Sequence, residues 1–331
     1  MPGSCLILDG SIRGAILQYQ DLCESRTIND LGSHVRLRYP YESRFLTVNG
    51  WRMHYIDEGP PEAAPILLCH GNPTWGYLWR DVIPPLLAAG HRVVVPDQIG
   101  FGLSEHPHSP TAHSLQNHSA NLVALIDGLN LREIFFVCHD WGGPTGLSAL
   151  LTRRSLASGI AVMSTWAWRE PSADFHRGMM WKTLHAPLLG PYIMGRKGAF
   201  PGRSMYLSVV DREKCLEDSV GAYMSVLPDV GDRRLTWQWP RSIPIDPDTD
   251  KVGKHFDWLE KEIRGLKIPA TVIWGREEVV FTADIFSNHW MKIWPHAEGP
   301  HLVTGNHFLQ EDSGEEIGGL LADFARRRLV R

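Results

Sequence analysis

The 331-residue sequence predicts an α/β fold, a mostly parallel central sheet flanked by helices with an inserted helical cap, or lid. Three observations lead to this prediction. Short apolar runs of strand length alternate with segments of helical periodicity. That alternation breaks only from about Trp168 to Ile243, where no strand run occurs. Near the start, Asn49-Gly50 separates two alternating segments, which is typical of a tight hairpin turn.

Each predicted element has a local justification in the sequence. The alternating segments Arg44–Val48 and Trp51–Asp57 are expected to pair as the hairpin. Apolar runs without alternation indicate strands buried on both faces, as in parallel sheets. They occur at Pro65–Cys69, Arg92–Val95, Glu133–Cys138, Ile160–Met163, Ala270–Trp274 and His301–Val303. The expected helices include Ser114–Leu129, Lys254–Arg264, Asp284–Ile293 and Glu315–Arg328.

The domain organisation follows from where the alternation stops and resumes. We expect an N-terminal extension over residues 1–38 and the first part of the α/β core over 39–167. Residues 168–243 form the predicted cap, and 244–331 form the second part of the core. An all-helical insertion between two α/β stretches is expected to cover the sheet and not to stand as a separate domain.

Composition excludes several classes of protein. Lys and Arg total 33 against 37 for Asp and Glu, and this small acidic excess argues against a nucleic-acid partner. No segment approaches the ~20 apolar residues of a membrane helix, and the start lacks the pattern of a secretory signal. The five cysteines are scattered and form no metal-binding pair. We therefore expect a cytoplasmic, reduced chain without a membrane partner or metal.

The most informative segment is Val137-Cys138-His139-Asp140-Trp141-Gly142-Gly143. It places a carboxylate at the end of a buried strand, with glycines opening the next helix, which is typical of a nucleophile elbow with Asp as the nucleophile. The helix N-terminus favours the ionised, attacking form of Asp140. An ordinary helix N-cap would explain the Asp but leaves the glycine pattern unexplained.

A second segment, His70-Gly71-Asn72-Pro73-Thr74-Trp75, follows the strand that ends at Cys69. In the elbow arrangement this loop faces the nucleophile and supplies one backbone N–H of an oxyanion hole. We expect that N–H from Asn72 and the other from Trp141. A simple turn is the alternative, because Gly, Asn and Pro are also turn residues.

The remaining catalytic groups are predicted from strand ends. His307 follows the last strand, where a general base belongs, although the chain holds 16 histidines. The base needs a carboxylate to orient it, and the loop after Ala270–Trp274 offers Glu278, with Glu277 as the fallback. Trp75 and Trp166 lie next to strand ends and are candidates for pocket lining. The other tryptophans at the cap are expected to pack it on the core: Trp168, Trp181, Trp237 and Trp239.

From Tyr39 onward the sequence resembles the haloalkane dehalogenases of the α/β-hydrolase superfamily. The matching motifs are YPYESRFLTVNGWRMHYIDEG, HGNPTWGYLWR, VVVPDQIGFGLSE, HDWGGPTG and GNHFLQED. The resemblance implies that a haloalkane and water give an alcohol and a halide through an ester on Asp140, without a cofactor. It also implies that Asn72 and Trp141 bind the halide. Two positions depart from the family, Glu278 where Asp is usual and Asn306 where Gly is expected before the histidine.

Three other functions remain open at this point. An epoxide hydrolase could use the same nucleophile and base, with two of Tyr192, Tyr206 and Tyr223 protonating the epoxide oxygen. Haloacetate hydrolysis is less expected, because Trp141 occupies a position where a cationic clamp would need Arg. A non-catalytic ligand sensor on the same scaffold is the alternative outside enzymes. The expected partners are thus a small apolar halogenated substrate, water and the halide product.

Overall fold

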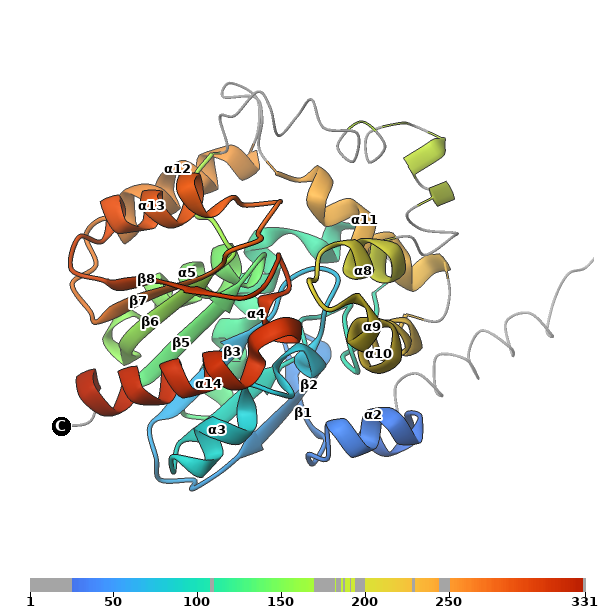
Figure 1. Cartoon of the computed structure of the whole chain (residues 1–331), viewed down its shortest axis with the longest axis horizontal. Coiled ribbons are helices and arrows are strands. Elements are labelled where there is room, and N and C mark those ends of the chain that lie inside the picture. Colours follow the sequence, from blue (N-terminus) through green and yellow to red (C-terminus); the bar gives the residue numbers. More distant parts are fainter. Residues whose placement is uncertain are drawn as a thin grey trace, which may run out of the picture.

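The computed structural model describes residues 26–107, 110–169, 200–227, 230–243 and 251–329, with a few single positions between 182 and 193. Its centre is an eight-stranded sheet in the order β1-β2-β4-β3-β5-β6-β7-β8 (Figure 1). Helices flank the sheet, and the helical insertion lies between β6 and β7. The predicted fold class is confirmed.

The strands follow the apolar runs of the sequence closely. They are β1 (Arg44–Val48), β2 (Trp51–Glu58), β3 (Pro65–Cys69), β4 (Arg92–Pro96), β5 (Ile134–His139), β6 (Ala157–Met163), β7 (Ala270–Gly275) and β8 (Glu298–Val303). The hairpin β1–β2 and the pair β2–β4 are antiparallel, and every other pair is parallel. Because β3 and β5 are buried throughout, they have no polar face, and their sequences show no alternation.

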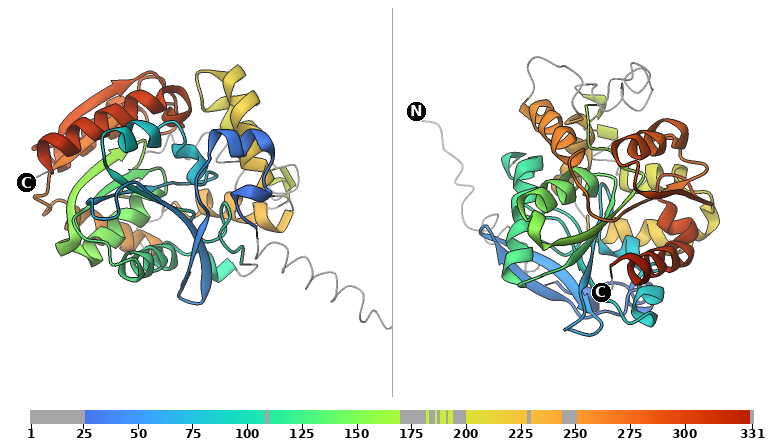
Figure 2. Two further views of the ribbon diagram at one scale, coloured as in Figure 1. Left: turned by 90° about the horizontal axis from the view of Figure 1, so that it is seen from below. Right: turned by 90° about the vertical axis from the view of Figure 1, so that its left-hand side faces the viewer.

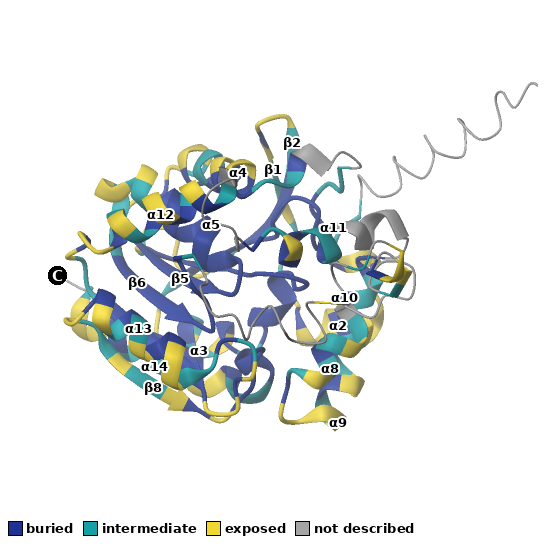
Figure 3. Ribbon diagram, turned by 90° about the horizontal axis from the view of Figure 1, so that it is seen from above, coloured by how far each residue is buried: buried dark blue, intermediate teal, exposed yellow. Residues whose placement is uncertain are grey.

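Helices cover both faces of the sheet (Figures 1 and 2). Side chains of α3 (Ile83–Ala88) and α14 (Leu309–Arg328) belong to the apolar cluster of one face. The other face packs against α4 (Leu115–Gly128), α5 (Gly142–Thr152), α12 (Lys251–Ile263) and α13 (Ala283–Ile293). Figure 3 shows the strands buried between these layers, with the exposed residues on the outer sides of the helices.

The described part of the cap lies at one end of the sheet (Figures 1 and 3). It includes α8 (Met205–Leu207), α9 (Arg212–Lys214), α10 (Gly221–Ser225), α11 (Val230–Arg241) and the π-helical segments Phe200–Ser204 and Cys215–Val220. Residues 1–25 of the predicted extension and Trp181 of the predicted cap are outside the described residues. The short helix α2 (Ser33–Arg38) precedes the first strand. No helix in the described ranges has the length and apolar character needed to cross a membrane.

Two predicted boundaries at the C-terminal end are wrong. The last strand begins at Glu298 and not at His301. As the edge strand it is only partly buried, so it carries a glycine, a proline and polar residues in place of an apolar run. The last helix begins at Leu309 and not at Glu315, because Ser313, at φ −135°, kinks the helix and interrupts its periodicity.

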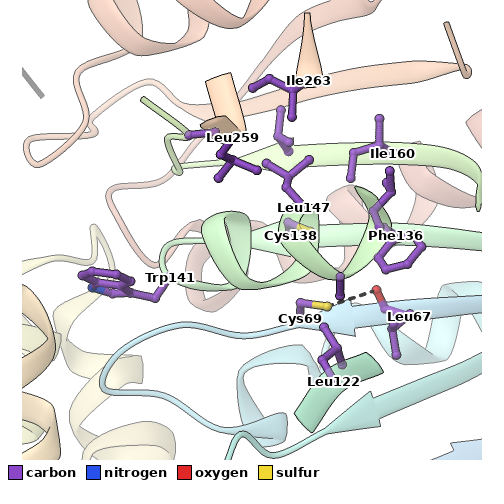
Figure 4. Packing of buried hydrophobic residues seen from close by; sticks show 14 of the residues in the cluster. Leu67, Cys69, Leu122, Phe136, Cys138, Trp141, Leu147, Ile160, Leu259 and Ile263 are labelled. Carbon is purple, nitrogen blue, oxygen red and sulfur yellow. Dashed lines mark hydrogen bonds between the residues drawn. The ribbon is translucent and has the colours of Figure 1, made fainter. Parts of the chain in front are cut away.

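Small residues let α5 approach the sheet closely. Cys69 and Cys138 lie side by side on β3 and β5 beneath this helix (Figure 4). A Cβ on Gly146 of α5 would come within 2.7 Å of the Cys138 sulfur. Trp141, at the start of the helix, lies at one end of this cluster in Figure 4. The close packing of α5 on β3 and β5 therefore determines where the turn between β5 and α5 lies.

Adjacent glycines in α14 provide a matched stability test. A Cβ on Gly318 would lie 2.5 Å from the carbonyl oxygen of Val82, whereas one on Gly319 meets nothing within 4 Å. Gly319→Ala should raise the free energy of unfolding by about 0.5–1 kcal/mol through helix propensity. Gly318→Ala should lower it by about 1–3 kcal/mol through overpacking. Urea denaturation of both variants measures the two changes, and equal shifts of the same sign would contradict this packing of α14 on α3.

Candidate active site

The turn between β5 and α5 holds Asp140 in a left-handed conformation, with φ at 51°. Such backbone angles are uncommon for residues other than glycine and often mark functional sites. The turn fits only because the next residues lack side chains. A Cβ on Gly142 would lie 2.1 Å from the carbonyl oxygen of Cys69, and one on Gly143 would overlap Thr165. The glycine pattern of the sequence is thus a packing requirement of the elbow.

The loop after β3 meets the Asp140 carboxylate, as predicted. The backbone N–H of Asn72 donates to Asp140 Oδ1 at 2.7 Å. A Cβ on Gly71 would lie 2.2 Å from the same oxygen, so only glycine leaves room for the carboxylate. The backbone N–H of Trp141 also lowers the pKa of Asp140. The two backbone N–H groups predicted to form the oxyanion hole therefore both lie beside this carboxylate.

The predicted base and acid lie on the other side of Asp140. Nε2 of His307 is 3.4 Å from Asp140 Oδ2, and its Nδ1 is 3.1 Å from Glu278 Oε2. The second oxygen of Glu278 accepts the N–H groups of Val280 and Phe281 at 2.7 and 3.1 Å. Glu278 thus reaches His307 despite its extra methylene. Its orientation is fixed by its own loop.

The fallback acid, Glu277, points elsewhere. Its side chain is exposed and accepts the backbone N–H of Gly305 at 2.8 Å. The N–H of Glu277 in turn donates to the Gly305 carbonyl at 3.0 Å. Of the two glutamates, the structure places only Glu278 against the imidazole.

Electrostatics favour an ion triplet in the unliganded protein. Burial raises the pKa of Asp140, but the hydrogen bond and positive charge of His307 outweigh it, and the pKa ends below its usual value. The pKa of Glu278 is lowered for the same reason, against the effect of burial. Burial lowers the pKa of His307, but the charge of Glu278 and the hydrogen bond to Asp140 raise it to about 10. The imidazole is therefore protonated at neutral pH.

His139 holds the backbone of the base. Its Nε2 lies 2.7 Å from the carbonyl oxygen of His307, so this nitrogen must carry a hydrogen. Burial and the neighbouring charge of His307 lower the pKa of His139 to about 4. His139 is therefore neutral and acts as a fixed donor. His139 directly precedes Asp140, but nothing in the sequence pattern predicts this contact with the base.

The cap helix α11 contacts both residues predicted to bind halide. The side-chain amide of Asn72 donates to the carbonyl oxygen of Thr236 at 3.0 Å. Pro240 lies four residues later and has no N–H, so it cannot give this carbonyl its usual helical hydrogen bond. On the same helix, Trp239 stacks on Trp141 with ring centroids 5.0 Å apart. Sequence reasoning missed Thr236, and it expected Trp239 only to pack the cap on the core, without a contact to Trp141.

The two tryptophans predicted to line the pocket have different surroundings. Trp166 packs edge-on against Trp141 at 5.0 Å, so it lies beside the site. Trp75 instead stacks on Tyr77 and packs against Tyr39, in the apolar cluster of the opposite face of the sheet. The prediction for Trp75 is corrected to a core position. A place in the loop after a strand does not determine the direction of the side chain.

Comparison with known proteins agrees with this geometry. Residues 64–189 match the α/β-hydrolase fold family. Over 86% of the chain, the sequence is 31% identical to a haloalkane dehalogenase from Psychrobacter cryohalolentis, of which it covers 93%. The chain belongs to the haloalkane dehalogenase family of the α/β-hydrolase superfamily. It is accordingly a haloalkane dehalogenase-like enzyme.

Two further similar proteins bear on this assignment, one through its activity and one through its fold. A cis-3-alkyl-4-alkyloxetan-2-one decarboxylase from Shewanella oneidensis is 29% identical, over 84% of this chain and 86% of its own length. The crystal structure of a haloalkane dehalogenase from Bradyrhizobium elkani superposes with a TM-score of 0.77 at 24% identity, covering 86% of this chain and 98% of that structure. The second comparison supports the fold of this dehalogenase-like chain. The first shows that similar sequences carry more than one chemistry.

The raised pKa of His307 leads to a direct titration test. Asp140→Asn removes one of the two carboxylates beside the imidazole, so the pKa of His307 should fall from about 10. NMR titration of the labelled imidazole measures this pKa in the wild-type protein and the variant. Asp127→Asn is the matched control, because Asp127 pairs with Arg153 at the surface. An Asp140→Asn variant with an unchanged His307 pKa would contradict the proposed ion triplet.

Proposed function

We propose that this enzyme hydrolyses the carbon–halogen bond of small haloalkanes through a covalent ester on Asp140. The observation that carries the proposal is the surroundings of the Asp140 carboxylate. It is buried, accepts the N–H of Asn72, and faces a histidine that is itself held by Glu278. Burial raises the pKa of Asp140, but the hydrogen bond and charge of His307 bring it below its usual value, which favours the ionised form. Nothing in this arrangement requires a cofactor.

In the first step a carboxylate oxygen of Asp140 attacks the saturated carbon that bears the halogen. A carbon–oxygen bond forms, the carbon–halogen bond breaks, and the halide leaves with the bonding electrons. Thr236 accepts one N–H of the Asn72 amide, and an amide carries two. The second N–H and the indole N–H of Trp141 are assigned to the halide, whose charge grows in the transition state. A carboxylate suits this step because the resulting ester can be hydrolysed.

In the second step water attacks the carbonyl carbon of the ester. Esterification removes the negative charge of Asp140, which lowers the pKa of His307 and lets it release its proton to solvent. His307 then accepts a proton from the attacking water, and Glu278 stabilises the imidazolium that forms. The backbone N–H groups of Asn72 and Trp141 stabilise the oxyanion. Collapse releases the alcohol and regenerates the Asp140 carboxylate.

The tyrosines of the cap weigh against the epoxide hydrolase alternative. Tyr223 is fully buried and donates its hydroxyl to Glu311 at 2.6 Å, so that proton is committed to a carboxylate. Tyr192 is 48% exposed to solvent. Tyr206 lies beneath the guanidinium of Arg212, 5.6 Å from its ring centroid. The described contacts therefore offer no convergent tyrosine pair beside Asp140.

A variant without the base tests the proposed function. His307→Phe should still react with 1-bromohexane, because the imidazole takes no part in the displacement. It should release about one equivalent of bromide and then stop, with the alkyl mass on the peptide that contains Asp140. Ion chromatography measures the bromide, and mass spectrometry locates the adduct.

The control is His296→Phe, which replaces an exposed histidine whose Nε2 lies 3.0 Å from the Ile268 carbonyl oxygen, and it should keep multiple turnovers. Bromide release without an adduct on Asp140 would refute covalent catalysis. An adduct with styrene oxide alone would reassign the enzyme to epoxides. Loss of carbon dioxide from an oxetan-2-one by the wild-type enzyme, without bromide release from bromoalkanes, would favour the chemistry named for the Shewanella relative. A wild-type protein inert towards all three substrates would favour a ligand sensor.

A further inference from the structure

Asn306 directly precedes the proposed general base, and its side chain joins two loops. Its Oδ1 accepts the backbone N–H of His307 at 2.8 Å and that of Val279 at 3.1 Å. Because both donors are backbone N–H groups, the atom between them must be the amide oxygen. Val279 directly follows Glu278. One side-chain oxygen therefore binds the backbone of the base itself and that of the residue after the acid.

The two loops are the one that follows β7 and the one that follows β8. A second pair of hydrogen bonds also joins them. Glu277 and Gly305 exchange hydrogen bonds upstream of Asn306. Nearer the base, the two loops are joined by the Asn306 bridge, by the Glu278–His307 pair and by an edge-on contact between the rings of Phe281 and His307, whose centroids are 5.5 Å apart. A glycine at position 306 would leave the N–H groups of Val279 and His307 without this acceptor. The separation of acid and base would then depend on their own contact and on the packing of Phe281 against His307.

The backbone of Asn306 is also linked to the cap, through the carboxylate of Asp312. Its backbone N–H donates to Asp312 Oδ2 at 3.2 Å. The same carboxylate accepts the backbone N–H groups of Val210 and Asp211, at 3.0 and 2.9 Å, from the cap segment before α9. The residue after the base, Phe308, donates its N–H to the carbonyl of Ser208 at 3.2 Å. The loop that carries the base is therefore anchored on both sides of His307.

We propose that Asn306 is a positioning residue that sets the distance and angle between Glu278 and His307, an inference that rests on the proposed function. Glu278 is one methylene longer than Asp and has more freedom of rotation. The bridge at Val279 restricts that freedom at the backbone, immediately after the acid. Asn306 therefore acts on the hydrolysis of the ester, where the imidazole must be aligned, and has no effect on the displacement of halide.

Asn306→Ala tests this assignment in single-turnover experiments with 1-bromohexane and excess enzyme. Bromide release and hexanol formation are followed separately by rapid quench. Bromide should appear at the wild-type rate, whereas hexanol formation should slow by about 10–100-fold, the scale of a misplacement near 1 Å. A variant that is merely destabilised would lose active protein and reduce both amplitudes together.

Two further variants make the comparison specific. Ser313→Ala removes a hydrogen bond to the Thr304 carbonyl of the same loop without touching the bridge, and it should behave as wild type. Asn306→Asp keeps an acceptor for both N–H groups and adds a negative charge near the imidazole. It should restore hexanol formation and move the acidic limb of its pH profile to higher pH, because the charge raises the pKa of His307.

A measurement without substrate separates this inference from the proposed function. The proton between His307 Nδ1 and Glu278 should give a low-field NMR resonance in the wild type and in Ser313→Ala, and this resonance should shift or vanish in Asn306→Ala. An unchanged resonance together with wild-type hexanol formation would overturn the positioning role. A wild-type enzyme that releases no bromide would instead overturn the proposed function, and the resonance would still test the bridge.

Discussion

The buried negative charge of Asp140 is the constraint on which the rest of the site depends. A carboxylate removed from water is costly unless donors and a counter-charge surround it. Here the N–H of Asn72 and the imidazolium of His307 supply both. The glycines at 71, 142 and 143 allow this packing, because a Cβ at these positions would collide with the Asp140 carboxylate, the Cys69 carbonyl or Thr165. The same ionised group that must be stabilised at rest is the one proposed to attack.

The charge of Asp140 also controls the protonation of His307, and through it the order of the proposed reaction steps. In the unliganded protein two carboxylates share one imidazolium, and the pKa of His307 is raised to about 10. An ester on Asp140 would remove one of those charges. The base would thus become available only after the displacement has occurred. The proposed order of the two steps would then follow from the change of charge on Asp140.

The sequence was sufficient for the parts of the site that parallel strands position. Asp140, Glu278 and His307 each follow a strand, and parallel strands end at the same edge, so their meeting could be predicted. The contacts of Thr236 and Trp239 with the site could not, because they depend on how the cap folds back over the sheet. The direction of Trp75 was misjudged, since a loop residue can turn to either face. The Asn306 bridge requires the loops after β7 and β8 to lie within hydrogen-bond distance of each other. The sequence of neither loop alone specifies that distance.

Both departures from the family motif, Glu278 and Asn306, lie on the same pair of loops. The structure accounts for them together, since the longer acid is held by its own turn and by the bridge to Val279. The cap anchors the other end of this arrangement through Asp312. The cap thus contacts the site in two places, through α11 at Asn72 and Trp141 and through Asp312 at the loop after β8.

Isotope labelling in a single turnover tests the covalent role of Asp140 most directly. With enzyme in excess over 1-bromohexane in water enriched in oxygen-18, the first hexanol should carry an unlabelled oxygen, because that atom comes from the Asp140 carboxylate. The label should appear on the peptide that contains Asp140. Labelled hexanol together with an unlabelled carboxylate would show direct attack by water and would contradict the account.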